Sequence, residues 1–159
     1  MDNATAYAAA LASARQGMAE GGIPIGASLL VDGELLAVGR NQRVQLGSAI
    51  HHGETNCIEI AGRQPASVYA RSTIFTTLSP CFMCAGTILL YKIPRVVIGE
   101  NSNFSISEDL LRSHGVEVIV LDDAETKTMF KDWIEANPRL WNEDIGEEAW
   151  HQLGRVLAI

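Results

Sequence analysis

The sequence predicts an α/β protein in which about five strands interleave with helices, so that helices pack on both faces of one sheet. Short apolar runs bounded by Gly, Pro or Asp recur along the chain and alternate with helical patterns. Over 159 residues, a hydrophobic fraction of 47% supplies enough apolar side chains for the core of one domain. The sequence contains no internal repeat, low-complexity tract or linker-like segment. We therefore expect residues 1–159 to form a single domain.

The first predicted elements are a helix and a β-hairpin. The helix is marked by apolar residues at helical spacing, which are Tyr7, Leu11, Ala14 and Met18. A Gly-Gly pair then ends this helix. The hairpin consists of residues 23–31 and 34–39, joined by Asp32-Gly33. That dipeptide is favoured in two-residue hairpin turns because it tolerates positive φ angles.

The remaining predicted elements alternate between helices and strands. In chain order they are a helix over residues 51–63, a strand over 71–78, an apolar helix over 84–92, a strand over 94–99 and a buried strand over 116–123. Asp123 is then expected to cap the last helix. The apolar stripe of that helix is formed by Met129, Phe130, Trp133 and Ile134.

Composition excludes several classes of protein. The formal net charge is -7 and there is no cluster of Lys and Arg, which argues against a nucleic-acid partner. No apolar run approaches the roughly 18 residues of a membrane span. Residues 1–22 lack the basic leader of a signal peptide. Three cysteines, an odd number, favour a reducing compartment over a disulfide framework, so we expect a cytoplasmic protein.

Two short motifs carry the candidate chemistry. The first is His52-Gly53-Glu54, and the second places Cys81 and Cys84 directly after a proline. The chain between the motifs has room for one helix, a loop and one strand. Both motifs are therefore expected to begin helices on either side of a strand. A helix start suits a metal-binding cysteine because its free N–H groups and its dipole favour the thiolate.

The cysteine pair alone is open to three interpretations, which are a redox pair, half of a structural zinc site, and two ligands of a catalytic metal. Together with His52, the pair supplies one imidazole and two thiolates and leaves a fourth tetrahedral position free. That pattern is typical of catalytic zinc, whereas structural zinc is usually closed by four protein ligands. Glu54 is then placed to move protons. The combined pattern H-x-E…P-C-x-x-C is the signature of zinc deaminases.

Much of the chain resembles the fungal cytosine deaminases, a branch of the cytidine and deoxycytidylate deaminase superfamily. The matching segments, in the same order and at about the same spacing, are residues 21–30, 41–54, 76–104, 115–123 and 141–147. The resemblance implies a three-layer α/β/α sandwich with a mixed sheet of about five strands, as in cytidine deaminases. It also implies a homodimer with one zinc ion per subunit. The implied reaction is the hydrolysis of free cytosine to uracil and ammonia, a step of pyrimidine salvage.

The resemblance also assigns roles to single positions. The family's zinc ligands fall on His52, Cys81 and Cys84, and its proton shuttle falls on Glu54. Its substrate-binding positions fall on Asn41, Gly53, Phe104, Trp141, Asp144 and Ile145. The sequence departs from the family at Asn142, where an aromatic residue is expected, and in a longer tail after Glu147. Both departures lie in the expected C-terminal lid, about residues 138–159.

Three alternatives stay open at this point. The protein could act on another free base, such as isocytosine or guanine, because the lid departs from the family pattern. A tRNA adenosine deaminase shares the zinc signature but needs a basic surface for phosphates. A zinc-stabilised binding module would need neither Glu54 nor an open coordination position. In the tail, Trp150, Leu153 and Leu157 fit either an extra turn of the lid or a dimer contact.

Overall fold

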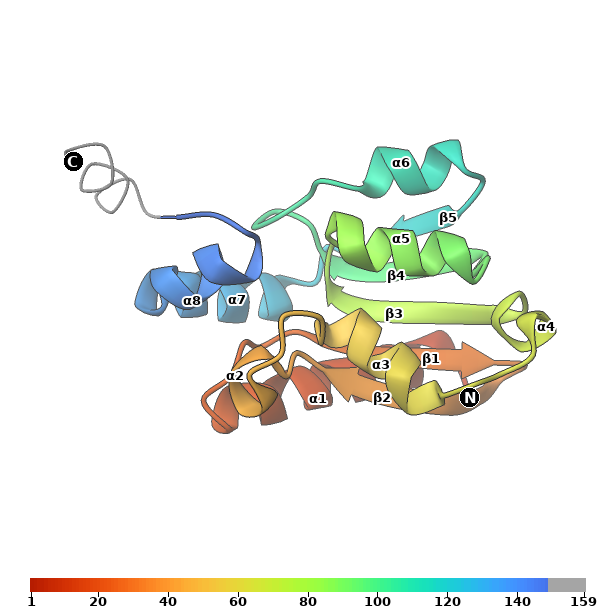
Figure 1. Ribbon diagram of the computed structural model, residues 1–159, viewed down its shortest axis with the longest axis horizontal. Helices are drawn as coiled ribbons and strands as arrows, with labels where there is room; N and C mark the ends of the chain where they lie inside the picture. The colour runs from red at the N-terminus through yellow and green to blue at the C-terminus, as the bar shows by residue number, and fades with distance from the viewer. Residues whose placement is uncertain (149–159) are drawn as a thin grey trace.

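The computed structural model describes residues 1–148 and contains one mixed sheet with strand order β2-β1-β3-β4-β5 (Figure 1). The strands are β1 (Gly26–Val31), β2 (Glu34–Arg40), β3 (Ser72–Leu78), β4 (Arg95–Glu100) and β5 (Glu117–Val120). β1 pairs antiparallel with both β2 and β3, whereas β3, β4 and β5 are parallel. The tail positions Trp150, Leu153 and Leu157 lie outside the described residues.

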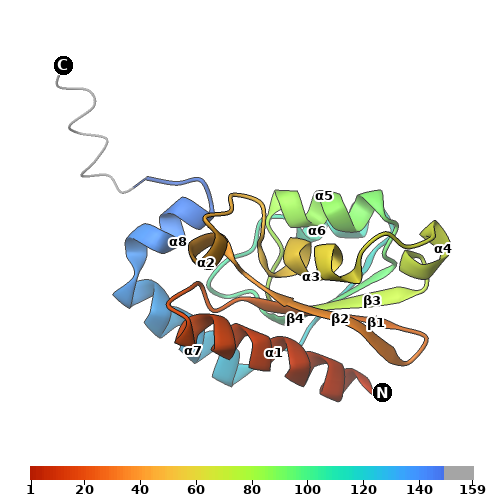
Figure 2. The same cartoon turned by 60° about the horizontal axis from the view of Figure 1, so that its bottom comes forward.

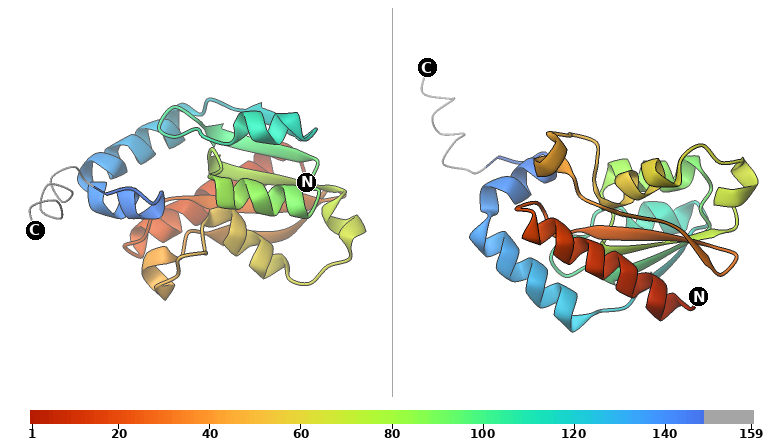
Figure 3. Two further views of the ribbon diagram at one scale, coloured as in Figure 1. Left: turned by 45° about the horizontal axis from the view of Figure 1, so that its top comes forward. Right: turned by 90° about the horizontal axis from the view of Figure 1, so that it is seen from below.

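Helices cover both faces of the sheet, as predicted. One face carries α1 (Asn3–Ala19) and α7 (Ala124–Ala136), which lie side by side. The other face carries α3 (Gly53–Ala61), α5 (Phe82–Leu90) and α6 (Glu108–Ser113), as Figures 2 and 3 show. Three further helices complete the fold, α2 (Arg43–Leu46), α4 (Ala66–Tyr69) and α8 (Pro138–Asp144). The three-layer α/β/α sandwich is thereby confirmed. Within residues 1–148, no helix combines the length and apolar character needed to cross a bilayer.

The local signals at helix and strand ends are also confirmed. Asp32 and Gly33 have φ angles of 50° and 82°, and they connect β1 to β2 as a two-residue turn. The Asp123 side chain accepts a hydrogen bond from the backbone N–H of Thr126 and so caps α7. The apolar stripe predicted for α1 is only partly correct, because Met18 is 39% exposed. The buried face of this helix is instead made mostly of small residues, which allows α1 to lie close to the sheet.

The prediction of a buried strand over residues 116–123 is wrong in its burial. The strand β5 is shorter, and its residues are half-buried or exposed. Its place in the sheet explains the difference, because β5 is an edge strand that pairs only with β4. Continuous apolar sequence therefore did not mean burial on both faces at this position.

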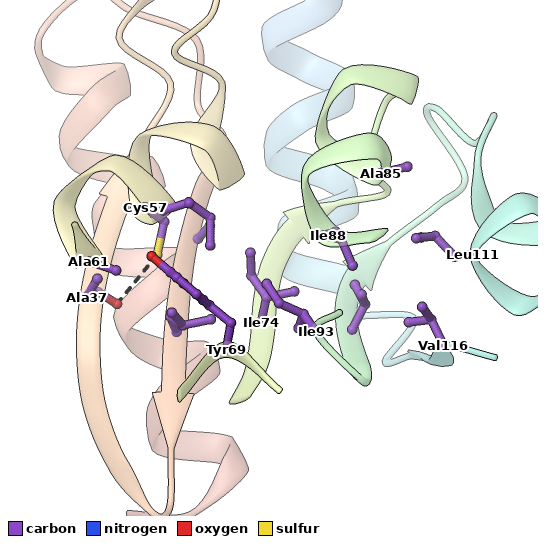
Figure 4. Packing of buried hydrophobic residues seen from close by; sticks show 14 of the residues in the cluster. Ala37, Cys57, Ala61, Tyr69, Ile74, Ala85, Ile88, Ile93, Leu111 and Val116 are labelled. Atoms are coloured by element: carbon purple, nitrogen blue, oxygen red, sulfur yellow. Dashed lines mark hydrogen bonds between the residues drawn. The ribbon is translucent and has the colours of Figure 1, made fainter. Parts of the chain in front are cut away.

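A hydrophobic core holds α3 and α5 against the sheet. Its side chains include Ile74 of β3, Ile88 of α5 and Cys57 of α3, all fully buried (Figure 4). The thiol of Cys57 donates to the backbone oxygen of Ala37 at 3.6 Å. A Cβ atom at Gly39 would lie 2.4 Å from the backbone nitrogen of Cys57, so only glycine allows α3 this close to β2.

Candidate active site

Two helix starts and one strand end meet at a single point of the molecule. His52 is the N-cap residue of α3, and Cys81 is the N-cap residue of α5. The strand β3 lies between these helices in the chain and ends three residues before Cys81. The prediction that both motifs begin helices on either side of a strand is confirmed. Donor groups far apart in the sequence are thereby brought to one end of the sheet.

His52, Cys81 and Cys84 form a group that could hold a metal ion. Their donor atoms all lie within 4.8 Å of one another. The Nδ1 atom of His52 is 3.4 Å from the Sγ atom of Cys81. One imidazole and two thiols suit zinc, and they leave a tetrahedral position free. Among residues 1–148 this group contains no fourth histidine, cysteine or carboxylate.

The negative groups in and around this donor group would stabilise a cation bound between the three side chains. A hydrogen bond from Cys84 lowers the pKa of Cys81 to about 4, with His52 adding to the effect against the opposing burial. The same hydrogen bond and burial raise the pKa of the Cys84 thiol. Burial alone would lower the pKa of His52, but the Cys81 thiolate and the nearby Asp144 raise it to about 9. A bound cation is stabilised by the same negative groups.

Glu54 lies beside this group but is not part of it. Its side chain is buried, and the Thr76 hydroxyl contacts its Oε1 atom at 3.0 Å. Burial raises the pKa of this carboxyl above its usual value. A carboxyl group in such surroundings can both accept and return a proton near neutral pH.

The predicted substrate-binding residues come together from four parts of the chain. The ring of Phe104 meets the edge of Trp141 at a centroid distance of 5.4 Å. Ile145 packs beside these rings, and Asn41 donates from Nδ2 to Oδ1 of Asp144 at 2.9 Å. A small pocket of about 10 Å³ is lined by Phe104, Trp141, Asp144 and Ile145 together with His52, Glu54 and Cys81. Asn41 and Gly53 do not line this pocket; Asn41 bonds to the lining residue Asp144, and Gly53 lies between the lining residues His52 and Glu54 in the chain.

Sequence reasoning missed three further residues that line the pocket, which are Ile25, Leu78 and Ser79. Leu78 and Ser79 could have been inferred, because they join the end of β3 to Cys81. Ile25 gives no sequence signal. It reaches the site because β1 pairs with β3, and a Cβ atom at Gly53 would lie 3.2 Å from the backbone oxygen of Ile25.

Helix α8, the first part of the expected C-terminal lid, lies beside α2 (Figure 2), and its residues Trp141 and Asp144 line the pocket. Glu143 of α8 is 3.6 Å from Arg43 of α2. The Oδ1 atom of Asp144 is 3.3 Å from Nε2 of His52. Outside the pocket, a wider hollow of about 470 Å³ is lined in part by Phe82 and Met83. This hollow is also lined by His52, Cys81 and Asp144, so it reaches the donor group beside α8.

Two buried carboxylates hold the loop between β4 and α6. Glu108 accepts hydrogen bonds from the Ser79 hydroxyl at 2.8 Å and from Nδ2 of Asn101 at 3.1 Å. Glu100 accepts two backbone N–H groups of the same loop. Because the loop carries Phe104, these contacts tie the pocket's aromatic residue to the segment that leads into Cys81.

A three-layer sandwich with one imidazole, two thiols and a buried glutamate at two helix starts defines the class of zinc-dependent deaminases. Residues 1–100 match the cytidine and deoxycytidylate deaminase zinc-binding region. The chain belongs to this deaminase family, whose members are hydrolytic enzymes.

Similar proteins include deaminases of different substrates. Cytosine deaminase from Candida albicans is 50% identical over 139 residues, which are 87% of this chain and 93% of that protein. A structure from a study of A-to-I editing by tRNA:A34 deaminases is 26% identical, with a TM-score of 0.65, and covers 76% of this chain and 99% of its own. Guanine deaminase from Nitrosomonas europaea is 18% identical, with a TM-score of 0.69 and coverage of 83% and 84%. This last likeness concerns the fold alone.

Proposed function

We propose that this protein hydrolyses free cytosine to uracil and ammonia. The observation that carries the proposal is the lid. Helix α8 brings Trp141 and Asp144 into the lining of the small pocket beside the donor group, where Oδ1 of Asp144 is 3.3 Å from Nε2 of His52. The 50% identity with the Candida albicans cytosine deaminase, over 87% of this chain, favours cytosine as the base.

The metal chemistry follows from the donor set. His52, Cys81 and Cys84 would hold one zinc ion. Bound zinc with three protein ligands lowers the pKa of a water molecule in the remaining position to about 7. The chain's own residues would then act on that water and on the bound base.

Glu54 is the proton carrier in this proposal. It takes a proton from the attacking water and delivers it to N3 of the ring, which makes C4 more electrophilic. After the water oxygen has added to C4, Glu54 takes the remaining proton of that hydroxyl and gives it to the amino group, so that the C4=O bond forms as the C4–N bond breaks and ammonia leaves; an amide anion would be too basic to leave. The contact with Thr76 keeps the carboxyl group turned toward the pocket.

Orientation of the base would come from the pocket walls. The rings of Phe104 and Trp141 are nearly perpendicular, so one of them can stack on a flat ligand while the other would meet the ligand's edge. The backbone amide of Gly53 would meet the ring oxygen, and Asp144 would accept the N1–H of the free base. Asn41 donates to Asp144 and accepts from the backbone N–H of Arg43, so its amide holds the carboxylate in one orientation.

The competing functions fit less well. The small pocket of about 10 Å³ holds neither a pyrimidine nor a purine ring, so cytosine is preferred to guanine on the 50% identity with the Candida albicans cytosine deaminase. A tRNA substrate is disfavoured by the net charge of -7. A purely structural zinc site would not explain a buried Glu54 next to a three-ligand group.

The helical face that carries α3 and α5 supports a homodimer. This face exposes large apolar side chains, which are Ile60, Phe82, Met83, Leu90, Tyr91 and Ile106. An exposed apolar surface of this kind fits a second copy of the chain. Leu90, which is 71% exposed, is the sharpest probe. Leu90→Asp should shift the mass measured by light scattering from two chains toward one, while an unshifted mass would exclude this face.

We also place the enzyme in the cytoplasm. Cys57, Cys81 and Cys84 are all free thiols. Oxidation of Cys81 or Cys84 would remove a thiolate that zinc needs, so a reducing compartment suits the site.

The direct test is product analysis with the purified zinc-loaded protein. Cytosine should yield uracil and ammonia in equal amounts, and the same assay should include isocytosine, guanine and adenosine. Cys84→Ala serves as a control that should hold no zinc and form no product. Faster turnover of any other base, or activity without metal, would overturn the proposal.

A further inference from the structure

The imidazole of His52 has a different partner on each ring nitrogen. Nδ1 faces the donor group, 3.4 Å from Sγ of Cys81. Nε2 faces the lid, 3.3 Å from Oδ1 of Asp144. The side chains of His52 and Asp144 are 9% and 2% exposed, so water has little access to this contact. An imidazole that binds a metal through one nitrogen carries its proton on the other, which here points at a carboxylate.

We propose that Asp144 is a positioning residue for His52, and that helix α8 thereby sets how tightly the metal is held. The inference rests on the zinc site of the proposed function. A carboxylate that accepts from the outer nitrogen fixes the tautomer and orientation of a ligating histidine and raises its basicity. The resemblance to cytosine deaminases gave Asp144 a role only in substrate binding.

The position of Asp144 is itself well determined. Asn41 donates from Nδ2 to the same Oδ1 atom at 2.9 Å. The oxygen of the Asn41 amide is held by the backbone N–H of Arg43 at 3.0 Å. The start of α2 therefore holds Asn41, and Asn41 holds Asp144 against the imidazole.

The two roles of Asp144 do not compete for one atom. The contacts with Asn41 and His52 both use Oδ1, so the substrate contact can fall to Oδ2. The consequence is a coupling between the lid and the metal. Any shift of α8 that withdraws Asp144 also removes the acceptor of the imidazole N–H, and the metal is then held less tightly.

The experiment measures zinc affinity by competition with a coloured chelator, independently of catalysis. The variants are Asp144→Ala, which removes the acceptor, and Asp144→Asn, which keeps an acceptor oxygen but removes the charge. The matched control is Glu143→Gln, the neighbouring acidic residue of α8, whose contact is with Arg43 at the mouth. Substitution by cobalt gives a second readout, because its absorption spectrum reports the ligand geometry.

We expect Asp144→Ala to weaken zinc binding by about 10- to 100-fold, with a smaller loss for Asp144→Asn and none for Glu143→Gln. If the alanine variant does not fold, the asparagine variant carries the test. Unchanged zinc affinity in the folded Asp144 variants, with one zinc in the unmodified protein, would overturn this inference alone. An unmodified protein that binds no zinc would overturn both the inference and the proposed function.

Discussion

At the scale of single residues, the surroundings of Glu54 distinguish a proton carrier from a metal ligand. The carboxyl group is buried and contacts the Thr76 hydroxyl, and it lies outside the three-residue donor group. Burial raises its pKa, so this carboxyl group holds a proton more readily than an exposed glutamate does. The metal ligands differ from Glu54 in that their donor atoms converge on one point, as in His52, Cys81 and Cys84.

The variant Glu54→Gln should separate these two roles. Glutamine keeps the size of the side chain and a group that can contact Thr76, but it cannot carry a proton between atoms of the substrate. We expect one zinc per chain, an unchanged melting temperature to within a few degrees, and turnover lowered by about 10²- to 10⁴-fold. Metal analysis and steady-state kinetics on one preparation measure the zinc content and the turnover. Loss of zinc in this variant would make Glu54 a ligand.

Zinc binding should release two protons near pH 7. In the metal-free protein the pKa of His52 is about 9 and that of Cys84 is raised, so both carry a proton, whereas Cys81, with a pKa of about 4, does not. Zinc needs all three deprotonated, so its affinity should fall as the pH is lowered. Calorimetry in buffers of different ionisation enthalpy counts the protons. Release of one proton or none would contradict these charge states, and any count above two would come from ionisation of a zinc-bound water.

The sequence predicted these four residues because they occur in compact motifs whose spacing reflects the chemistry. It could not predict Thr76 as the partner of Glu54, since that contact arises from the position of β3 beneath α3. The contact of Asp144 with His52 was equally inaccessible, because 92 positions of chain separate the two residues and only the tertiary fold closes that gap.

At the scale of elements, the loop between β4 and α6 links the aromatic wall of the pocket to the start of α5. The Ser107 hydroxyl donates to the backbone oxygen of Pro80 at 2.6 Å, next to Cys81. Glu108 gathers the Ser79 hydroxyl and the Asn101 amide. Neither serine nor glutamate is distinctive in sequence, so this connection is visible only in the fold.

The variant Glu108→Ala should therefore affect both stability and catalysis. The Ser79 hydroxyl and the Asn101 amide lose their acceptor, and a buried donor left unpaired costs about 1–3 kcal/mol. We expect the free energy of unfolding in urea to fall by about 2 kcal/mol and kcat/KM to fall with it. Asp109→Ala, at the exposed neighbouring position, should change stability by less than about 0.5 kcal/mol. Equal effects of the two variants would exclude the linking role.

The cap of α7 gives a pH-dependent prediction. Burial alone would raise the pKa of Asp123, but hydrogen bonds from Thr126 and Tyr7 outweigh it and lower the pKa. The stabilisation is therefore present above the unfolded pKa of about 3.9, and it is lost as the pH falls through the folded value. Asp123→Ala should cost about 1 kcal/mol at neutral pH and much less in acid. Asp132→Ala, in the exposed middle of the same helix, is the control. A cost that is independent of pH would contradict the charged cap.

Elements with their own local signal were predictable, and those defined by their neighbours were not. The Asp32-Gly33 turn and the Asp123 cap each depend on a few adjacent residues, and both are present. The burial of β5 depends on its place at the sheet edge, which no local pattern records. In the same way, the identity of the buried face of α1 depends on the small residues that the sheet requires.

At the scale of the whole molecule, the site lies where the carboxyl end of β3, the starts of α3 and α5, and the lid helix α8 come together. The sequence predicted the layers and the number of strands, because the spacing of apolar residues distinguishes each helix and each strand along the chain. It could not predict from its patterns which strands lie side by side. The order β2-β1-β3-β4-β5 is what brings Ile25 to the pocket wall.

We expect the lid to admit a free base and to exclude the corresponding nucleoside. Cytosine offers an N1–H to Asp144, whereas cytidine carries a ribose at that atom. In the proposed binding mode, the sugar would take away the N1–H donor meant for Oδ2 of Asp144 and would need space beside Trp141 and Asp144 of α8.

The most direct test is kcat/KM for cytosine and for cytidine, measured on one zinc-loaded preparation. We expect cytosine to be favoured by at least about 100-fold. Comparable values for the two substrates, or a preference for cytidine, would contradict the account of the lid and the substrate assigned from it.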